Sequence, residues 1–286
     1  MWLLFALGSA LFAGFTAILA KIGIKNTDSN LATAIRTVII LIFSWLMVFI
    51  VGSYNMISKI SNKTLLFLIL SGFATGASWL FYFKALQLGD VNKVTPIDKS
   101  STVLTMILAI IFLGEAVTIY KLASIVLIAF GTYLMVIKKQ ANRKKTPVGK
   151  WLIYALLSTV FASLTSILAK IGISGIESNL GTAIRTIIIF IMAWLIVFIT
   201  GKHKDIGKID KKSFMFICFS GITTGISWLC YYKALQDGQA SIVVPLDKLS
   251  ILFTIAFSYF VLKEKMGKKA IAGLIMQVAG TLLLLI

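Results

Sequence analysis

Charged side chains interrupt the apolar segments of this chain at matching places in its two halves. Asp98 lies about six residues into one apolar segment, Arg36 about five residues into another, and Lys84 about one helical turn from the end of a third. In a bilayer one such charge costs at least about 2.5–3.5 kcal/mol, so we expect pairing or contact with a water-filled cavity. Adding the lysine after each aspartate gives two sets, Arg36, Lys84, Asp98 and Lys99, and Arg185, Lys233, Asp247 and Lys248.

Two interpretations of these sets stay open. In the first they are structural ion pairs that fix helix packing, with the lysines reaching toward the interface. In the second they are gates on opposite sides of a central cavity, one breaking as the other forms. Three cations against one carboxylate leave each set positive, which favours a solute with a carboxylate or phosphate if the set faces a cavity.

Aromatic residues, prolines and a serine near these charges form a second group of candidates. Trp79 and Trp228 lie inside apolar segments rather than at the interface where tryptophan usually sits, which makes a cavity wall as good an interpretation as core packing. Each proline either begins a helix or breaks one near a site. The candidate cavity residues are Trp79, Tyr82, Phe83, Pro96, Ser100, Trp228, Tyr231, Tyr232 and Pro245.

The composition places the chain in a membrane. It is 59% hydrophobic and only 13% charged, against roughly 45–50% and 25% in soluble domains. Apolar stretches long enough to span a bilayer recur along its length, and we read the first as a retained span rather than a signal peptide. The net charge of +18 would suggest nucleic acid in a soluble protein, but here the lysines lie mainly between apolar runs, so no nucleic-acid partner is expected.

An internal repeat organises these segments. The sequence matches itself without gaps when Thr16 is set against Thr165, and the strongest block runs from Ser71 in one copy and from Ser220 in the other. Residues 1–137 form the first repeat, the basic stretch 138–150 the linker, and 151–286 the second repeat. Each repeat contains five apolar segments: 2–20, 31–51, 64–88, 92–113 and 119–137, then 151–169, 180–200, 213–237, 241–262 and 269–286.

The expected fold is therefore an all-α membrane protein with ten transmembrane helices in two inverted-topology five-helix repeats. An odd number of spans per repeat makes the second copy enter from the opposite face. About three quarters of the 28 Lys and Arg fall on the side of the linker, which predicts a cytoplasmic linker and both termini outside, in a bacterial-type inner membrane.

Seven positions in each repeat carry a family resemblance. The first copy shows Trp79, Tyr82, Ala85, Leu86, Pro96, Leu113 and Glu115, and the second repeats the pattern from Trp228 to Glu264. This arrangement resembles the EamA-like part of the drug/metabolite transporter superfamily over essentially the whole chain, and its Asp-Lys after the proline is similar to the short five-helix members. The resemblance implies a ten-helix inverted-repeat fold around a cavity lined by the third and fourth helices of each repeat, without implying a substrate.

The leading expectation is a secondary transporter that moves a small polar metabolite by alternating access, driven by a proton or an exchanged solute. We expect no cofactor, no metal site, bilayer lipid as the surroundings, and a monomer or weak homo-oligomer. The alternatives are a small cation exporter, for which the first segment lacks an acid, a lipid-linked sugar translocase, and a non-transport assembly subunit. An enzyme is not expected, because the single histidine and the few acids form no catalytic motif. Glu115 and Glu264 are expected to be exposed at helix ends, with proton coupling as the alternative.

Overall fold

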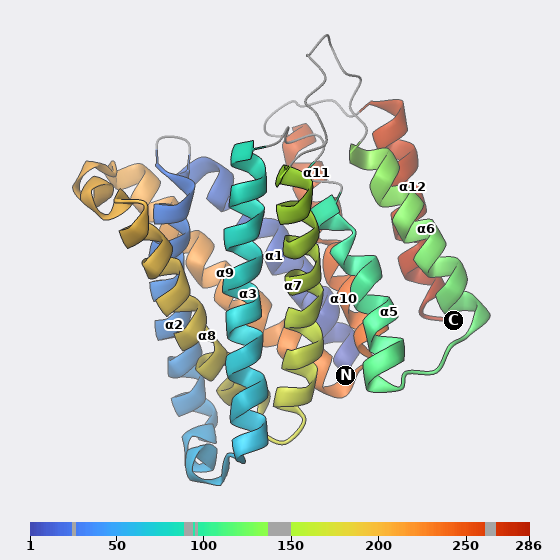
Figure 1. Cartoon of the computed structure of the whole chain (residues 1–286), viewed down its shortest axis with the longest axis horizontal. Coiled ribbons are helices and arrows are strands. Elements are labelled where there is room, and N and C mark those ends of the chain that lie inside the picture. Colours follow the sequence, from blue (N-terminus) through green and yellow to red (C-terminus); the bar gives the residue numbers. More distant parts are fainter. Residues whose placement is uncertain (25–26, 89–93, 95–96, 137–149, 261–266) are drawn as a thin grey trace. The chain divides into compact units, whose positions relative to one another are not determined.

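The computed structural model describes residues 1–24, 27–88, 94, 97–136, 150–260 and 267–286, and every regular element in these ranges is a helix (Figure 1). Pro96, Glu264, the side chain of Phe83 and linker residues 138–149 lie outside this description. The helices of the first repeat are α1 Trp2–Gly23, α2 Ser29–Val51, the 3-10 helix η1 Ser53–Lys59, α3 Asn62–Leu88, α5 Ser101–Leu113 and α6 Ile119–Val136. Those of the second are α7 Lys150–Ile173, α8 Ser178–Ile199, η2 Lys202–Lys208, α9 Lys211–Asp237, α10 Ala240–Lys248, α11 Ser250–Phe260 and α12 Lys268–Leu283.

Local sequence signals explain where several helices begin and end. The Asp28 carboxylate accepts the backbone N–H groups of Asn30 and Leu31, and so begins α2. Gly52 ends the same helix with φ +75°, a conformation that glycine adopts without steric cost. Glu177 caps α8 in the same way as Asp28 caps α2, through the N–H of Leu180. The two copies thus share their start signals as well as their apolar segments.

Among the described residues, six helices are long and apolar enough to cross a membrane: Trp2–Ala20, Ser29–Val51, Asn62–Tyr82, Lys150–Ile173, Ser178–Ile199 and Lys211–Asp237. α6 is apolar but shorter. The fourth segment of each repeat is not one continuous helix, since α5 has only 13 residues and the second copy divides into α10 and α11. Exposed apolar side chains such as Ile42, Phe49 and Ile50 of α2 suit contact with lipid.

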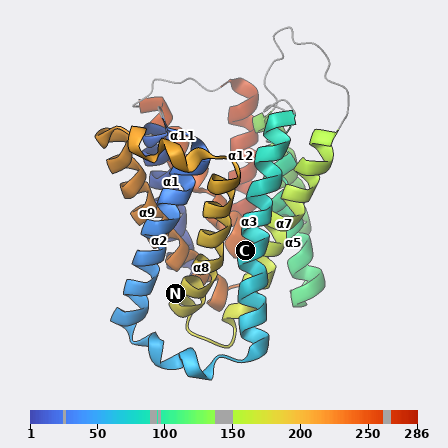
Figure 2. The ribbon, with the colours of Figure 1, turned by 60° about the vertical axis from the view of Figure 1, so that its left-hand side comes forward.

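The described chain divides into two units. The first comprises residues 1–76, 168–238 and 246–263. Within it α1 packs along α9, and α2 packs against both α8 and α9 (Figures 1 and 2). A Cβ atom on Gly225 would lie 2.7 Å from the ring of Phe43, and one on Gly72 would lie 2.7 Å from Ile188. Small residues therefore bring the third helix of each copy close to the second helix of the other copy.

The second unit comprises residues 77–167, 239–245 and 264–286. In it α6 packs against α12, where a Cβ atom on Gly131 would lie 2.6 Å from the carbonyl oxygen of Gly273 (Figure 1). Met106 of α5, Ile128 of α6 and Leu284 form one buried cluster of this unit. The fifth helices of the two copies are thus partners of each other.

Candidate functional site

Both aspartates lie where the fourth segment of a repeat is interrupted. Pro245 stands inside α10, Asp247 is its penultimate residue, and α11 begins at Ser250. In the first copy residues 97–99 are helical, a turn follows at Ser100, and α5 begins at Ser101, so Asp98 occupies the matching position. Interrupted helices leave backbone groups without intrahelical partners, and such breaks recur at binding sites of transporters.

Each aspartate accepts a hydrogen bond from the first helix of the other copy. In the first unit the Ser9 hydroxyl donates to Asp247 Oδ1 at 2.6 Å and lies 3.3 Å from the Ser227 hydroxyl. Lys248 Nζ lies 3.5 Å from the second oxygen of Asp247. In the second unit the Ser158 hydroxyl donates to Asp98 Oδ1 at 2.9 Å. Ser9 corresponds to Ser158 in the repeat, so one contact is built twice.

Hydrogen bonds also connect these serines to the third helix of the opposite copy. Ser227 of α9 donates to the backbone carbonyl of Ser9 at 3.1 Å, and the Ser158 hydroxyl, whose one proton is shared with Asp98, lies 3.1 Å from the carbonyl oxygen of Ser78. Thr159 donates to the Ile97 carbonyl oxygen at the break, at 2.6 Å. Each break therefore joins three helices through hydroxyl groups.

The two arginines bind hydroxyls of the third helices. The side chain of Arg185 is almost completely buried; its Nε donates to Ser71 at 2.8 Å, its Nη2 donates to Thr75 at 3.4 Å, and its guanidinium carbon lies 4.1 Å from the ring centre of Tyr232. Arg36 Nη2 donates to Thr224 at 2.7 Å. Among the described residues, the buried Nη1 of Arg185 and Nε of Arg36 have no hydrogen-bond partner.

The predicted charge sets are only partly brought together. Asp247 and Lys248 are in contact, but Lys233 pairs with Asp237 at 3.2 Å. No ion pair within 4 Å joins Arg185 to Asp247 in the part of the chain that the structure describes. Of the first set, Arg36 belongs to one unit, whereas Lys84, Asp98 and Lys99 belong to the other, with both lysines exposed. The gating role and the structural role of both sets stay predictions.

The predicted cavity residues have varied surroundings. Tyr82 packs against a buried cluster of Ala85, Val94, Trp151 and Ala155. The rings of Tyr231 and Tyr232 meet edge to face at 4.9 Å, which places Tyr232 between Tyr231 and Arg185. Ser100 donates to the Ile97 carbonyl at 2.6 Å. Trp79 and Trp228 are half-buried, and Pro245 is buried. Their lining of a common cavity stays a prediction.

The expectation of an exposed Glu115 is wrong. Its side chain is 7% exposed and lies 3.5 Å from Lys121 Nζ, which is equally buried. The carboxylate accepts the backbone N–H groups of Ala240 and Ser241 and the Ser241 hydroxyl, so it caps the start of α10. The N-terminal end of a helix attracts a negative charge, which explains why this glutamate is buried.

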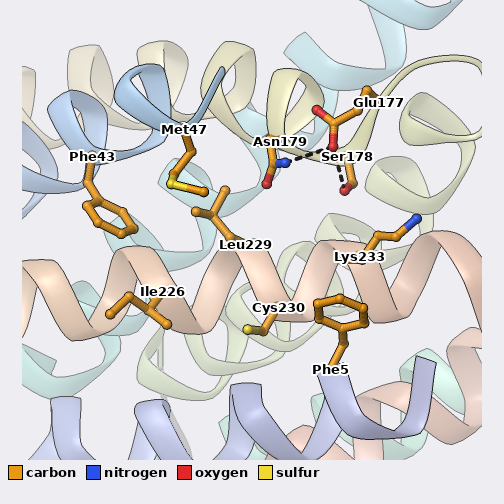
Figure 3. A pocket seen from close by; sticks show the side chains of 10 residues that line it. All are labelled: Phe5, Phe43, Met47, Glu177, Ser178, Asn179, Ile226, Leu229, Cys230 and Lys233. Atoms are coloured by element: carbon orange, nitrogen blue, oxygen red, sulfur yellow. Dashed lines mark hydrogen bonds between the residues drawn. The ribbon is translucent and has the colours of Figure 1, made fainter. Parts of the chain in front are cut away.

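A pocket of about 320 Å3 lies within the first unit (Figure 3). None of the predicted cavity residues whose side chains are described lines it, although Lys233 of the second charge set does. Its lining residues are Phe5, Phe43, Met47, Glu177, Ser178, Asn179, Ile226, Leu229, Cys230 and Lys233.

Sequence reasoning missed the serine partners of the aspartates. The signal was present, because Ser9 and Ser158 match in the repeat, as do Ser78 and Ser227. A hydroxyl in an apolar segment is a weak signal by itself, since it can bond to its own helix backbone. Retention of the same hydroxyl in both copies was the stronger signal.

Comparison with known proteins gives several relatives. An uncharacterized transporter "in cobO 3'region" of a Sinorhizobium species is 45% identical over 136 residues, which are 48% of this chain and 96% of the relative. An uncharacterized protein of Methanocaldococcus jannaschii is 33% identical over 133 residues, 46% of this chain and 94% of its own length. An uncharacterized transporter of Bacillus subtilis is 26% identical over 215 residues, 73% of this chain and 67% of the relative.

One solved structure, titled only "Crystal structure of protein", shares the fold with a TM-score of 0.79 at 14% identity, covering 99% of this chain and 96% of that one. The profile of the EamA-like transporter family matches residues 1–137 and 149–286, one match for each repeat. The chain is therefore a multi-pass membrane protein of the EamA-like transporter family, and a transporter rather than an enzyme.

Proposed function

We propose that the chain is a secondary active transporter of a small polar metabolite, amino-acid-like or otherwise bearing a carboxylate or phosphate, and that it works by alternating access in the inner membrane. The observation that carries the proposal is the duplicated contact of a serine with an aspartate at a helix break, Ser9 with Asp247 and Ser158 with Asp98. A transporter with two access states must be closed on one side of the membrane in one state and on the other side in the other state. Two equivalent contacts, one from each repeat, suit these two closed sides.

The proposal places ten helices in two inverted five-helix repeats, with the linker in the cytoplasm and both termini outside. In this arrangement the two contacts lie toward opposite faces of the membrane. A hydrogen bond to a charged group is worth about 1.5–3 kcal/mol. Exchanging one for the other is large enough to shift a two-state equilibrium by about tenfold or more in either direction.

The charge of the solute follows from Arg185. The Arg185 guanidinium is almost completely buried, and its Nη1 has no acceptor among the described residues. A carboxylate or phosphate is the usual bidentate partner of arginine, so an acidic solute would complete its bonding. A proton or an exchanged solute then drives the cycle.

The test begins with a thermal-shift screen of purified protein against metabolite classes, because a ligand that binds only the folded state stabilises it. For each solute that raises the melting temperature, uptake into proteoliposomes is then measured. Asp98→Asn and Asp247→Asn are each expected to lower flux by about tenfold and to shift the protein toward opposite access states. Asp205→Asn is the matched control, since Asp205 lies in the short helix η2 and pairs with Lys208. Unchanged flux and unchanged access in both variants would refute the gates.

A further inference from the structure

The pocket of the first unit has walls of two kinds (Figure 3). Phe43 and Met47 of α2 and Ile226 and Leu229 of α9 make an apolar wall. Glu177 and Asn179 at the start of α8 lie at the other end of the pocket, with Lys233 near the end of α9. A ligand that matches this lining has an apolar body and a polar head.

Cys230 is one of the pocket positions at which the two copies differ. Cys230 corresponds in the repeat to Phe81, and Phe5 corresponds to Tyr154. In the second unit Phe81 stacks on Tyr154, with ring centres 6.1 Å apart, and on Phe161 at 5.5 Å. In the first unit the corresponding place holds the small thiol of Cys230, which lines the pocket. The fold therefore accepts an aromatic ring at this position, and the smaller cysteine leaves room for a ligand.

The polar end offers opposite charges that are not paired with each other. Lys233 Nζ bonds to Asp237 at 3.2 Å, which occupies one of its three N–H donors. Glu177 accepts from Ser178 at 3.3 Å, from Asn179 at 2.8 Å and from the N–H of Leu180 at 3.1 Å. Within the described chain no ion pair shorter than 4 Å joins Glu177 to Lys233. A head group with both an ammonium and an acid group can meet the carboxylate and the lysine together.

We infer that this pocket binds a zwitterionic solute with an apolar side group, the ammonium toward Glu177, the acid toward Lys233, and the side group against Phe43, Met47 and Leu229. Its volume of about 320 Å3 is at the small end of ligand sites, which suits a solute of a few carbon atoms rather than a large drug. Binding of this solute in the pocket does not depend on the proposed function. Only its transport across the membrane rests on that proposal.

The test uses norleucine and its two single-charge analogues, hexanoate and pentylammonium, on the full chain in detergent and in nanodiscs. In a Cys218→Ser background, norleucine is expected to slow alkylation of Cys230 by N-ethylmaleimide at least about tenfold, because a bound side group covers the thiol. Each analogue should need about tenfold or more higher concentration for the same protection, since it leaves one charged group without its partner.

Variants separate the site from the fold. Cys230→Phe is expected to abolish norleucine binding in calorimetry, whereas Cys218→Phe, on the same helix but outside the pocket, should retain it. Lys233→Met should remove the preference for norleucine over pentylammonium, and Glu177→Gln should remove the preference over hexanoate. Equal binding by the two phenylalanine variants, or equal protection by all three probes, overturns the inference.

Two further outcomes distinguish cargo from other occupants. If phosphatidylethanolamine nanodiscs protect Cys230 before any solute is added and norleucine adds nothing, the pocket holds a bilayer lipid and the inference fails. If norleucine binds as expected but shows no uptake into proteoliposomes, the site stands and its ligand is not cargo. If Cys230→Phe loses norleucine binding while another solute is still carried, the site and the proposed transport both stand.

Discussion

Replacing Arg185 by methionine distinguishes a role of this arginine in solute binding from a role in helix packing. The guanidinium is almost completely buried and bonds to Ser71 and Thr75 while lying over the ring of Tyr232. If these contacts exist to hold helices together, their loss unfolds the protein. If they hold the charge ready for a solute, the fold tolerates the loss and the solute does not bind.

The magnitude follows from the contacts. Two hydrogen bonds to a charged group contribute about 1.5–3 kcal/mol each, but taking an ion out of water costs several kcal/mol. Nη1 of Arg185 has no acceptor in the described chain and the bond to Thr75 is long at 3.4 Å, so we expect the gain and the desolvation cost to be about equal. Arg185→Met should therefore change the free energy of unfolding by less than about 1 kcal/mol, or raise it. Ser71→Ala, which leaves the buried charge without its best partner, should lower it by about 1–3 kcal/mol.

The assay is chemical unfolding in detergent, combined with the thermal shift produced by whichever acidic solute binds the wild-type protein. The methionine variant should lose that thermal shift, and Arg185→Lys should recover only part of it, because an ammonium lacks the two parallel donors of a guanidinium. A loss of more than about 3 kcal/mol in the methionine variant, with the solute still bound, would show that Arg185 is a structural tie.

Three other predictions follow from the packing and the caps. Gly131→Ala should lower the free energy of unfolding by about 1–3 kcal/mol, because its Cβ would meet backbone at 2.6 Å, whereas Gly8→Ala, whose nearest neighbour is a thiol at 3.7 Å, should be near neutral in the same unfolding assay. Glu115→Ala should lower the free energy of unfolding by about 3–5 kcal/mol, because it removes the carboxylate beside the buried Lys121 and leaves that lysine only its hydrogen bond to Gln239. Adding Lys121→Met should restore part of the loss. The Ser213 N–H holds the pKa of Asp210 below its usual value, so the stability from this cap is present above about pH 4 and is lost as pH falls through the lower folded-state pKa. A melting-temperature series in acid should show that component missing in Asp210→Asn.

Helix positions were readable from the sequence because long apolar runs and caps act locally. The segment predicted at 180–200 is α8 at Ser178–Ile199, and the one at 213–237 is α9 at Lys211–Asp237. The differences are a residue or two, where polar residues of the first turn join a helix that the apolar pattern begins later. The 3-10 helices η1 and η2 were missed, since short helices with i→i+3 bonds carry no apolar period.

The partners of the site residues were not readable, because they depend on contacts far apart in the sequence. Charge alone suggested that Arg185 and Asp247 attract each other, yet Arg185 binds hydroxyls of α3, and Asp247 binds Ser9 and its own neighbour Lys248. Glu115 follows a glycine that ends α5, which made an exposed helix end the natural expectation. Its burial depends on the start of α10 in the other copy, which no local pattern announces.

The contacts around both aspartates run between the two copies, so a single copy cannot make them within itself. Ser9 with Asp247 and Ser158 with Asp98 always join one copy to the other, and so do the bonds of both arginines to the third helices. One copy by itself has the serine, the aspartate and the arginine, but lacks the opposite copy that each of them contacts. Residues 1–137 expressed alone should therefore form a dimer that pairs Ser9 of one chain with Asp98 of its partner, as this chain pairs Ser158 with Asp98. Disulfide trapping between cysteines placed at those two positions checks this expectation, and a stable monomer whose serine and aspartate meet within one chain would contradict it.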